Sequence, residues 1–558
     1  MKFSNILLAG VAAIALVSCG KKDEAGDAPR SETSREAARA DAGSPLDKRF
    51  SLKGAEEVDV DALFALMPED ERPSYDTARF DESLGATVVE NLRFADADDG
   101  EAVVVSRAEF YGVDMDAIER IRGAEEAGLD APFETVFQKV RFLDIASTGH
   151  MEEDEAATLT IGGVEFDRLQ IRQGGFDEEG PGDEGARFLN AVNLAGLYFK
   201  DMELVTTSDE APSVAFSAPD LRFVGMGGGR VGAVIANDLS YDMKQSAESL
   251  AAMREAMGPQ GAVFLSGPLA GIVAPESQQV AMESLEWRDI DFSGLLAWGL
   301  KDEKPPMSEK DLIDLGTMKA TNMMTKVNGK TAATVEEASV SAANFTWLIP
   351  SDIRADTKGA VYDFTAYVPE TEEEAMKVLK DAGLDKVTGD GKMSWAWNEK
   401  SGAADFNYVA NLDKVASLQA DMAFSNMKLD EIAAAMDDGE EDAVLSNGAF
   451  KSLNIKLEDQ KALDAIFSLA ALQMGGTGED LRMSAPAMIR LSGAQVAQMN
   501  PRFTDYVNAV ADFVAKGGSL EISAKPAEPV PFATLQANGA TAPQTMPDML
   551  GLTVTHEE

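Results

Sequence analysis

The sequence predicts a mainly β protein with C-terminal helices (α+β): an elongated, repeated antiparallel β meander with bulged strands, whose sheet the helices cap or cover. Between residues 84 and 344, short runs alternate apolar and polar side chains and are separated by Gly, Asp and Asn clusters, a pattern typical of antiparallel strands. A six-residue cassette recurs along this region. From Lys461 the apolar period lengthens to about 3.6 residues, which indicates helices.

Composition excludes several classes of protein. The chain has 558 residues, and its 49 basic and 96 acidic side chains give a net charge of −47, with 45% hydrophobic residues. This apolar content is enough to build cores, so wholesale disorder is excluded, and the acidity argues against a nucleic-acid partner. One Cys and two His leave few groups for metal or thiol chemistry. We therefore expect no cofactor and no metal site.

Residues 1–18 have the features of a secretory signal, with Lys2 before an apolar stretch at residues 6–17 that is too short to span a bilayer. The stretch ends in Leu16-Val17-Ser18-Cys19, which resembles the lipobox of bacterial lipoproteins. The resemblance implies cleavage before Cys19 and a diacylglycerol on its sulfur. Gly20 stands where an inner-membrane retention signal typically has Asp, which favours the outer membrane. The alternative is an ordinary signal peptide in which Cys19 is incidental.

The segment that follows is predicted to be a tether. Residues 19–49 contain almost no large apolar side chain, so ordering them would gain too little to offset the lost entropy. Residues 58–67 then have the pattern of a short helix, which Pro68 ends.

The repeated cassette predicts a specific backbone feature. Each copy has an apolar residue, an aromatic residue two positions on, Gly, Asp or Asn two further, and then another apolar residue. The alternation of inward-facing residues is therefore shifted by one residue within each copy. Gly, Asp and Asn tolerate the left-handed backbone conformation that such a shift requires. Each copy is predicted to be a bulged or sharply turned strand. The aromatic residues of the six copies are Phe110, Phe142, Phe199, Phe223, Trp287 and Phe424.

Sheet units that repeat in this way stack into a long curved sheet. The cassettes resemble the AsmA-like repeat proteins of the bacterial envelope. The resemblance implies a β-sheet trough with an apolar inner face, into which the six cassette aromatics would point. This chain departs from that family in lacking an N-terminal membrane helix, and a generic β meander is the alternative.

The meander is expected to fill residues 50–345 and to continue through residues 346–450 with one inserted helix. Residues 361–368 are predicted to form a strand. A capping box at residues 371–374 then starts a helix that Gly383 ends. Residues 393–397 and 406–409 alternate across a turn, which predicts a hairpin.

The last region, residues 451–558, is predicted to contain a strand, two helices and a final strand. Apolar residues share one helical face at residues 463–474 and again at 503–514, and Gly pairs follow both segments. A Pro-rich tail begins at Pro526, and residues 550–555 have the pattern of the last strand.

Two glycine motifs resemble nucleotide-binding loops, but hairpin turns explain them better. Residues 227–232 fit a dinucleotide fingerprint, yet a strand follows instead of the helix that would hold the pyrophosphate. Asn328-Gly329 lies between two alternating segments, which is typical of a β-turn. His150 beside the acids at residues 152–155 could bind a cation, although such an acidic run is usually a solvated patch.

These observations favour a non-catalytic, lipid-anchored envelope protein whose sheet holds an apolar ligand, either a lipid or an acyl chain. We expect an outer-membrane lipoprotein with its body in the periplasm and with Cys19 as its link to the membrane. One alternative is a structural lipoprotein that binds an envelope protein partner. A distant third is an unrecognised hydrolase, which would have to use His150, His556 or one of the acidic clusters.

Overall fold

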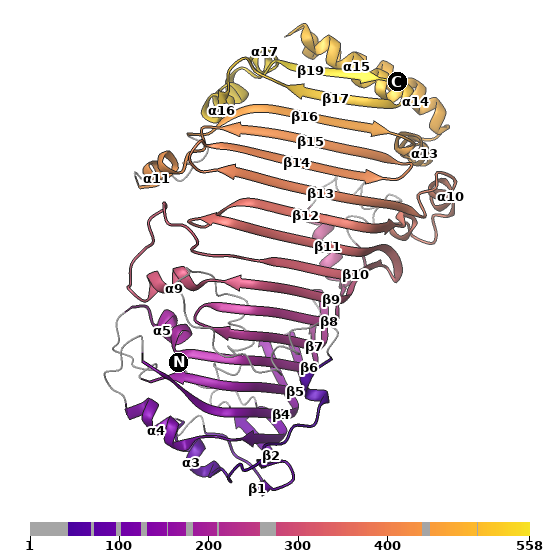
Figure 1. The fold of residues 1–558 in the computed structure, drawn as a ribbon. Helices are drawn as coiled ribbons and strands as arrows, with labels where there is room; N and C mark the ends of the chain where they lie inside the picture. The colour runs from indigo at the N-terminus through magenta and orange to yellow at the C-terminus, as the bar shows by residue number, and fades with distance from the viewer. Residues whose placement is uncertain are drawn as a thin grey trace. The chain divides into compact units, whose positions relative to one another are not determined.

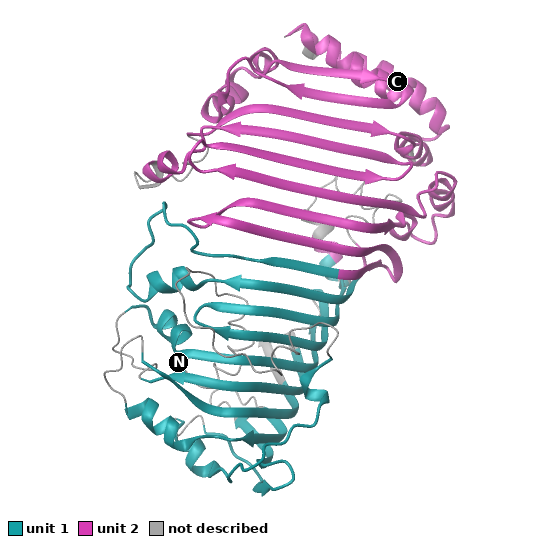
Figure 2. Ribbon diagram, in the orientation of Figure 1, with its two compact units in different colours: residues 1–249, 279–320 teal, residues 250–278, 321–558 magenta. Residues whose placement is uncertain are grey.

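A computed structural model describes residues 43–67, 72–95, 102–123, 131–152, 155–173, 182–208, 211–256, 275–437, 447–498 and 500–558. The signal sequence, the lipobox and Cys19 therefore lie outside the described residues. The chain divides into two compact units (Figure 2). Unit 1 comprises residues 1–249 and 279–320, and unit 2 comprises residues 250–278 and 321–558.

Unit 1 is an antiparallel meander in which each strand from β1 to β8 pairs with the next one along the chain (Figure 1). The protein is thus mainly β, as the sequence predicts. The strands are β1 (Thr77–Asp81), β2 (Ala86–Ala95), β3 (Ala102–Tyr111), β4 (Phe133–Glu152), β5 (Glu155–Arg172), β6 (Val192–Ser208), β7 (Ser213–Gly227), β8 (Arg230–Lys244) and β9 (Ser277–Asp291). The helices are η3 (Pro45–Asp47), α3 (Val60–Phe64), α4 (Met115–Gly123), α5 (Glu184–Ala191), α6 (Ala247–Ala256), which extends into unit 2, and α9 (Ser293–Gly299).

The predicted left-handed residues are present in all six cassettes. Their φ angles are 58° at Gly112, 53° at Asp144, 49° at Asp201, 68° at Gly225, 60° at Asp289 and 58° at Asn426. In β3 and β4 the pairs Val105–Ile145 and Arg107–Leu143 flank Asp144 without a change of register, so this copy is a sharp bend instead of a bulge. Bulge-like register shifts occur elsewhere, for example between Ala423 and Phe424.

The bends preserve the inward face. Phe142 precedes the bend at Asp144 and Ile145 follows it, and both side chains are buried in the same hydrophobic core. Without the slip, every side chain after the bend would turn to the other face. The register places four left-handed residues, Asn91, Asp144, Asp201 and Asp238, in one row across β2, β4, β6 and β8, and two of them, Asp144 and Asp201, belong to cassettes.

Unit 2 is also an antiparallel meander, with two small departures after β16. Both β17 and β18 pair with β16, and β19 pairs with β17. The strands are β10 (Thr317–Val327), which the unit boundary crosses, β11 (Lys330–Thr346), β12 (Ile349–Tyr362), β13 (Val387–Asn398), β14 (Ala403–Leu412), β15 (Ala416–Ser425), β16 (Ala449–Asp459), β17 (Gly518–Ala524), β18 (Val530–Pro531) and β19 (Leu552–Glu557).

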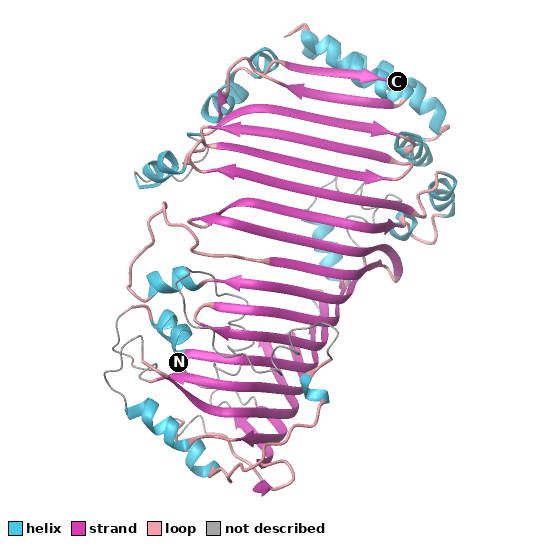
Figure 3. Cartoon of the chain, in the orientation of Figure 1, coloured by secondary structure: helices cyan, strands magenta, loops and turns pink. Residues whose placement is uncertain are grey.

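The helices of unit 2 lie at the ends of its strands and toward the C-terminus (Figure 3). They are η5 (Phe364–Tyr367), α10 (Glu373–Asp381), α11 (Leu429–Asp437), α13 (Ala462–Met474), α14 (Gly478–Ala497), α15 (Arg502–Lys516), α16 (Phe532–Thr541), η6 (Pro543–Thr545) and α17 (Met546–Met549). The helices predicted at residues 463–474 and 503–514, the hairpin at 393–409 and the last strand are confirmed as α13, α15, β13–β14 and β19.

Four local predictions in unit 2 are wrong. Residues 346–450 hold the α-helices α10 and α11 where the sequence predicts one, and residues 451–558 hold α14, α16, α17, β17 and β18 besides the predicted strand, two helices and final strand. The strand predicted at residues 361–368 ends at Tyr362, because the Asp363 side chain accepts a hydrogen bond from the Thr365 amide and starts the short helix η5. The capping box is also absent. Helix α10 forms and Gly383 follows it with φ 74°, but its N-cap is Glu372, whose side chain makes no capping hydrogen bond.

Candidate functional site

An N-terminal segment, which we call the strap (residues 44–58), crosses one face of the sheet in unit 1. The predicted tether thus stops short of residue 49: Ser44 and Pro45 are buried, and Leu46 packs against the core around Tyr198. Asp47 forms an ion pair of 2.5 Å with Lys200 on β6. At its far end the strap joins the opposite face, where Val58 enters the main core.

The strap covers buried charges in the middle of the sheet. Glu165 is fully buried and bonds both Lys139 and Arg141, with 2.6 Å between its Oε2 and Nε of Arg141. Asp167 lies 3.4 Å from Lys139 Nζ. The backbone carbonyl of Lys48 in the strap accepts a further bond of 3.1 Å from Arg141. Because buried charges are costly unless they are paired, this network fixes how the strap lies on the sheet.

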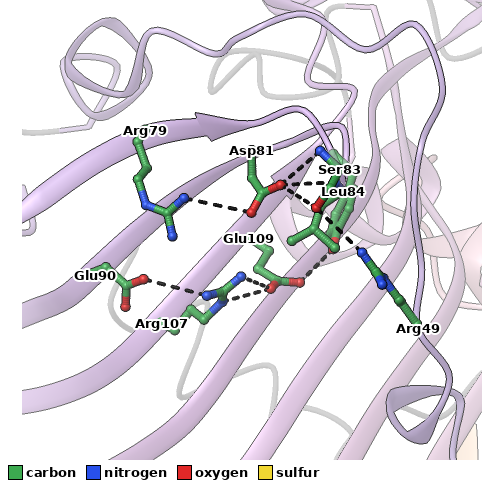
Figure 4. A network of polar contacts seen from close by, with 9 residues as sticks. Arg49, Arg79, Asp81, Ser83, Leu84, Glu90, Arg107 and Glu109 are labelled. Carbon is green, nitrogen blue, oxygen red and sulfur yellow. Dashed lines mark hydrogen bonds and ion pairs between the residues drawn. The ribbon is translucent and has the colours of Figure 1, made fainter.

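A second polar group, drawn in Figure 4, includes Glu109, which lies directly opposite Arg141 of the first group in the register of β3 and β4. Arg107 joins Glu90 and Glu109, at 3.6 Å and 2.7 Å. The Tyr111 hydroxyl donates to Glu109 over 2.6 Å, and Phe50 of the strap packs edge-on against the Tyr111 ring at 5.0 Å. Burial, followed by the hydrogen bond to Glu109, raises the pKa of Tyr111 above its ordinary value. Glu109 and Tyr111 are therefore buried, whereas Arg107 and Glu90 remain partly exposed.

Four of the six cassette aromatics lie in the core of unit 1. Phe110, Phe142, Phe199 and Phe223 are 6%, 8%, 3% and 6% exposed. Phe110 and Phe142 meet edge to face at 6.3 Å, and Phe199 and Phe223 do the same at 6.3 Å. These rings point inward, but they contact one another and neighbouring side chains, including Phe64 of α3. Helix α3 and the parts of the strands beyond the bends, with side chains such as Ile145, Ile161 and Met202, thus fill this part of the expected trough.

The remaining two cassette aromatics are half-buried. Trp287 on β9 donates from its indole nitrogen to the Leu315 carbonyl over 2.6 Å. Phe424 on β15 lies in unit 2, 6.3 Å from the Trp395 ring and 5.8 Å from the Phe532 ring. The six residues are therefore divided between unit 1 and unit 2.

Unit 2 has an apolar face that is only half-buried. The register aligns Ile353, Trp395 and Phe406 directly across β12, β13 and β14, and directly opposed residues share a face. Met422 and Leu453 extend this row across β15 and β16. We call this row and its neighbour the apolar strip; it comprises Ile353, Met393, Trp395, Phe406, Tyr408, Met422, Leu453 and Ile455, all half-buried.

The opposite face of the same strands is polar. Ser394, Asn407 and Asp421 occupy the alternate positions of β13, β14 and β15. A half-solvated antiparallel sheet normally turns its polar face to water and its apolar face to a core. Here α10 and α13 pack on the sheet through a hydrophobic cluster that includes residues at or just beyond strand ends, such as Val387 and Val415. This cluster contains no residue of the strip. A row of apolar side chains that solvent still reaches is a candidate binding face.

The motifs that resemble nucleotide sites are turns. Gly228 and Gly229 have positive φ between β7 and β8, and Asn328 and Gly329 have positive φ between β10 and β11, as predicted. His556 on β19 has its Nε2 2.7 Å from the Gly517 carbonyl oxygen. The His150 side chain and the acids beside it lie outside the described side chains.

No group of three His, Cys, Asp or Glu side chains among the described residues is arranged to hold a metal ion. Within the same residues, no helix combines the length and the hydropathy that crossing a bilayer requires.

Sequence reasoning missed the apolar strip and the buried charges. The strip residues alternate with polar ones, so each strand can be recognised in the sequence. A single sequence does not indicate which strands pair or in which register. Lys139, Arg141 and Glu165 are of types that usually face solvent, and only their alternation with buried Val140 and Phe142 hints at a second covered face.

Comparison with known proteins adds little. A family model described as an uncharacterized protein matches residues 409–557. The match begins in β14 and ends in β19, so it includes Met422, Leu453 and Ile455 of the strip. No curated protein matches the chain.

Proposed function

We propose that this protein is a non-catalytic, lipid-anchored envelope protein whose unit 2 holds an apolar ligand, a lipid or an acyl chain, on the apolar strip. The observation that carries the proposal is the cross-strand row from Ile353 to Leu453, where aromatic and aliphatic side chains stay half-exposed on one face. Binding would work by removing apolar surface from water and needs no reacting group.

The composition of the strip suits a flexible ligand. Met393 and Met422 have adaptable side chains that can fit chains of different shape, whereas Trp395 and Phe406 offer large rigid surfaces. Two cavities among the described residues lie at the strap's contact with the β1–β2 hairpin and around Gly359 and Gly389, and neither is lined by a strip residue. We therefore expect a ligand to lie along the strip.

Native mass spectrometry with lipid extraction tests the proposal, on a soluble chain beginning at Lys21 and purified from the periplasm without detergent. We expect bound lipid or acyl ligand at a defined stoichiometry. Replacing Trp395 and Phe406 by Ser should remove it, because the central apolar surface is lost. The matched control replaces Ser394 and Asn407 by Ala on the opposite face and should retain the ligand. A ligand-free wild-type protein would contradict the proposal.

The anchor is tested separately. Cys19→Ala should move the protein from the membrane fraction to the soluble periplasmic fraction, because an acidic body with net charge −47 is repelled by anionic lipid. Cell fractionation measures this change, and labelling with a radioactive fatty acid checks the acylation itself. Retention of the variant in the membrane fraction would show that another part of the protein binds the membrane or that a membrane partner holds the protein.

A further inference from the structure

Exposed apolar side chains concentrate on two helices of unit 2. Six of the ten large apolar side chains that are exposed in the described part of the chain lie within residues 466–491. They are Ile466, Leu472 and Met474 on α13 and Met483, Met488 and Leu491 on α14, and Leu491 is 78% exposed. A concentration of this kind marks an interaction surface more often than chance exposure.

The packing of α14 turns its apolar side outward. Ala485 and Pro486 are buried, and Gly493 faces Val507 of α15 so closely that a Cβ would lie 2.4 Å from that side chain. The exposed positions from residue 483 to residue 494 are Met483, Ser484, Ala487, Met488, Arg490, Leu491, Ser492 and Ala494. Arg490 is the only charged one among these, and Asp512 on α15 holds it at 2.5 Å. We call Met483, Met488 and Leu491 the α14 patch.

The surroundings of the α14 patch are acidic. Residues 462–516 contain four basic side chains, and every one is held in an ion pair with an acid: Arg482–Asp464, Arg490–Asp512, Arg502–Asp548 and Lys516–Glu558. Glu479 and Asp480, in the first turn of α14, and Asp505 on α15 are exposed. An incoming molecule therefore meets an apolar patch with an acidic rim.

We infer that the α14 patch docks a cationic amphipathic helix of a protein partner. Charge complementarity selects this occupant: basic side chains would meet the acidic rim while an apolar stripe covers Met488 and Leu491. Methionine-rich surfaces adapt to such helices. A second copy of this chain brings a further −47 charges, and an anionic bilayer is likewise repelled. The surface is separate from the apolar strip, so the inference stands apart from the proposed function.

The probe is an 18-residue peptide of Leu and Lys with Leu at helical spacing, titrated by fluorescence anisotropy against the full chain carrying Cys19→Ala. We expect binding that weakens at least tenfold in the double variant Met488→Glu with Leu491→Glu. Both substitutions add negative charge, so simple attraction between charges would strengthen and only loss of apolar contact weakens binding. The control replaces exposed Val205 and Met318 by Glu and should bind like the wild type.

Three further outcomes would overturn the inference. A peptide with Glu in place of Lys that binds equally well would reduce the patch to a non-specific apolar surface. Flotation with zwitterionic vesicles that needs Met488 and Leu491, without peptide binding, would identify a bilayer as the occupant. A dimer in size-exclusion chromatography that the double Glu variant abolishes would identify a second copy. Circular dichroism of both double variants checks that loss of binding is not loss of folding.

Discussion

Unit 1 and unit 2 use the same antiparallel meander but treat its two faces differently. In unit 1 the middle segments of the strands are covered on both sides, by the aromatic core around Phe142 on one side and by the strap over Glu165 on the other. In unit 2 one face is polar and the other carries the half-exposed apolar strip. Because both units are antiparallel meanders, the elements that cover the sheet decide whether its apolar face is core or surface.

The largest expected effect contrasts one residue type in the two units. Phe142→Ala in the core of unit 1 should destabilise that unit by about 3–5 kcal/mol, the cost of a buried Phe replaced by Ala. Phe406→Ala on the half-exposed strip should cost about 1 kcal/mol, because less apolar surface leaves water on folding there. Urea unfolding followed by hydrogen exchange of peptides from each unit measures both. Equal losses would show that the strip is packed like a core.

The strap should depend on the buried charges. Glu165→Gln leaves Lys139 and Arg141 without their shared partner and should cost about 3 kcal/mol, at the lower end for a broken buried pair because Asp167 remains 3.4 Å from Lys139. Residues 44–58 should exchange hydrogen faster in this variant. The control is Glu337→Gln, which removes an ion pair with exposed Lys358 in unit 2 and should change stability little. An unchanged strap in the Glu165 variant would contradict the role of the network.

A smaller effect of Tyr111 should appear at high pH in unit 1. The folded state holds the pKa of Tyr111 above its ordinary value of 10.0, so this residue keeps its proton at a pH where the unfolded chain loses it. Its contribution to stability is therefore complete below about pH 10 and declines as the pH rises further. The free energy of unfolding of the wild type should fall more steeply above pH 10 than that of Tyr111→Phe. Parallel curves would exclude this contribution.

Several features were predictable because they depend on local chemistry. The left-handed backbone at Asp144 and Gly112 follows from residue type and from the slip in apolar phase. Helix α15 has a clear apolar face, and glycines follow both α13 and α15. Helix α14 escaped prediction because its largest apolar side chains point outward and Pro486 lies inside it, so it lacks the usual pattern.

The candidate sites depended on contacts that are distant in the sequence. The strap meets Arg141 across 93 positions of the chain, so charges typical of a surface became a buried network. The sequence pattern indicates that four expected trough residues face inward, namely Phe110, Phe142, Phe199 and Phe223. It does not indicate that α3 and the parts of the strands beyond the bends fill the space in front of these rings. The apolar strip required the register of five strands, from β12 to β16.

The most direct test of the contrast between the units is photo-crosslinking with a fatty acid that carries a diazirine near the end of its chain. The acid is incubated with the soluble protein, irradiated, and located by peptide mass spectrometry. We predict attachment to peptides of β12–β16, with strong reduction when Trp395 and Phe406 are replaced by Ser. Attachment concentrated in β4–β7 of unit 1, or attachment in unit 2 that ignores these two replacements, would contradict the assignment of the ligand to the apolar strip.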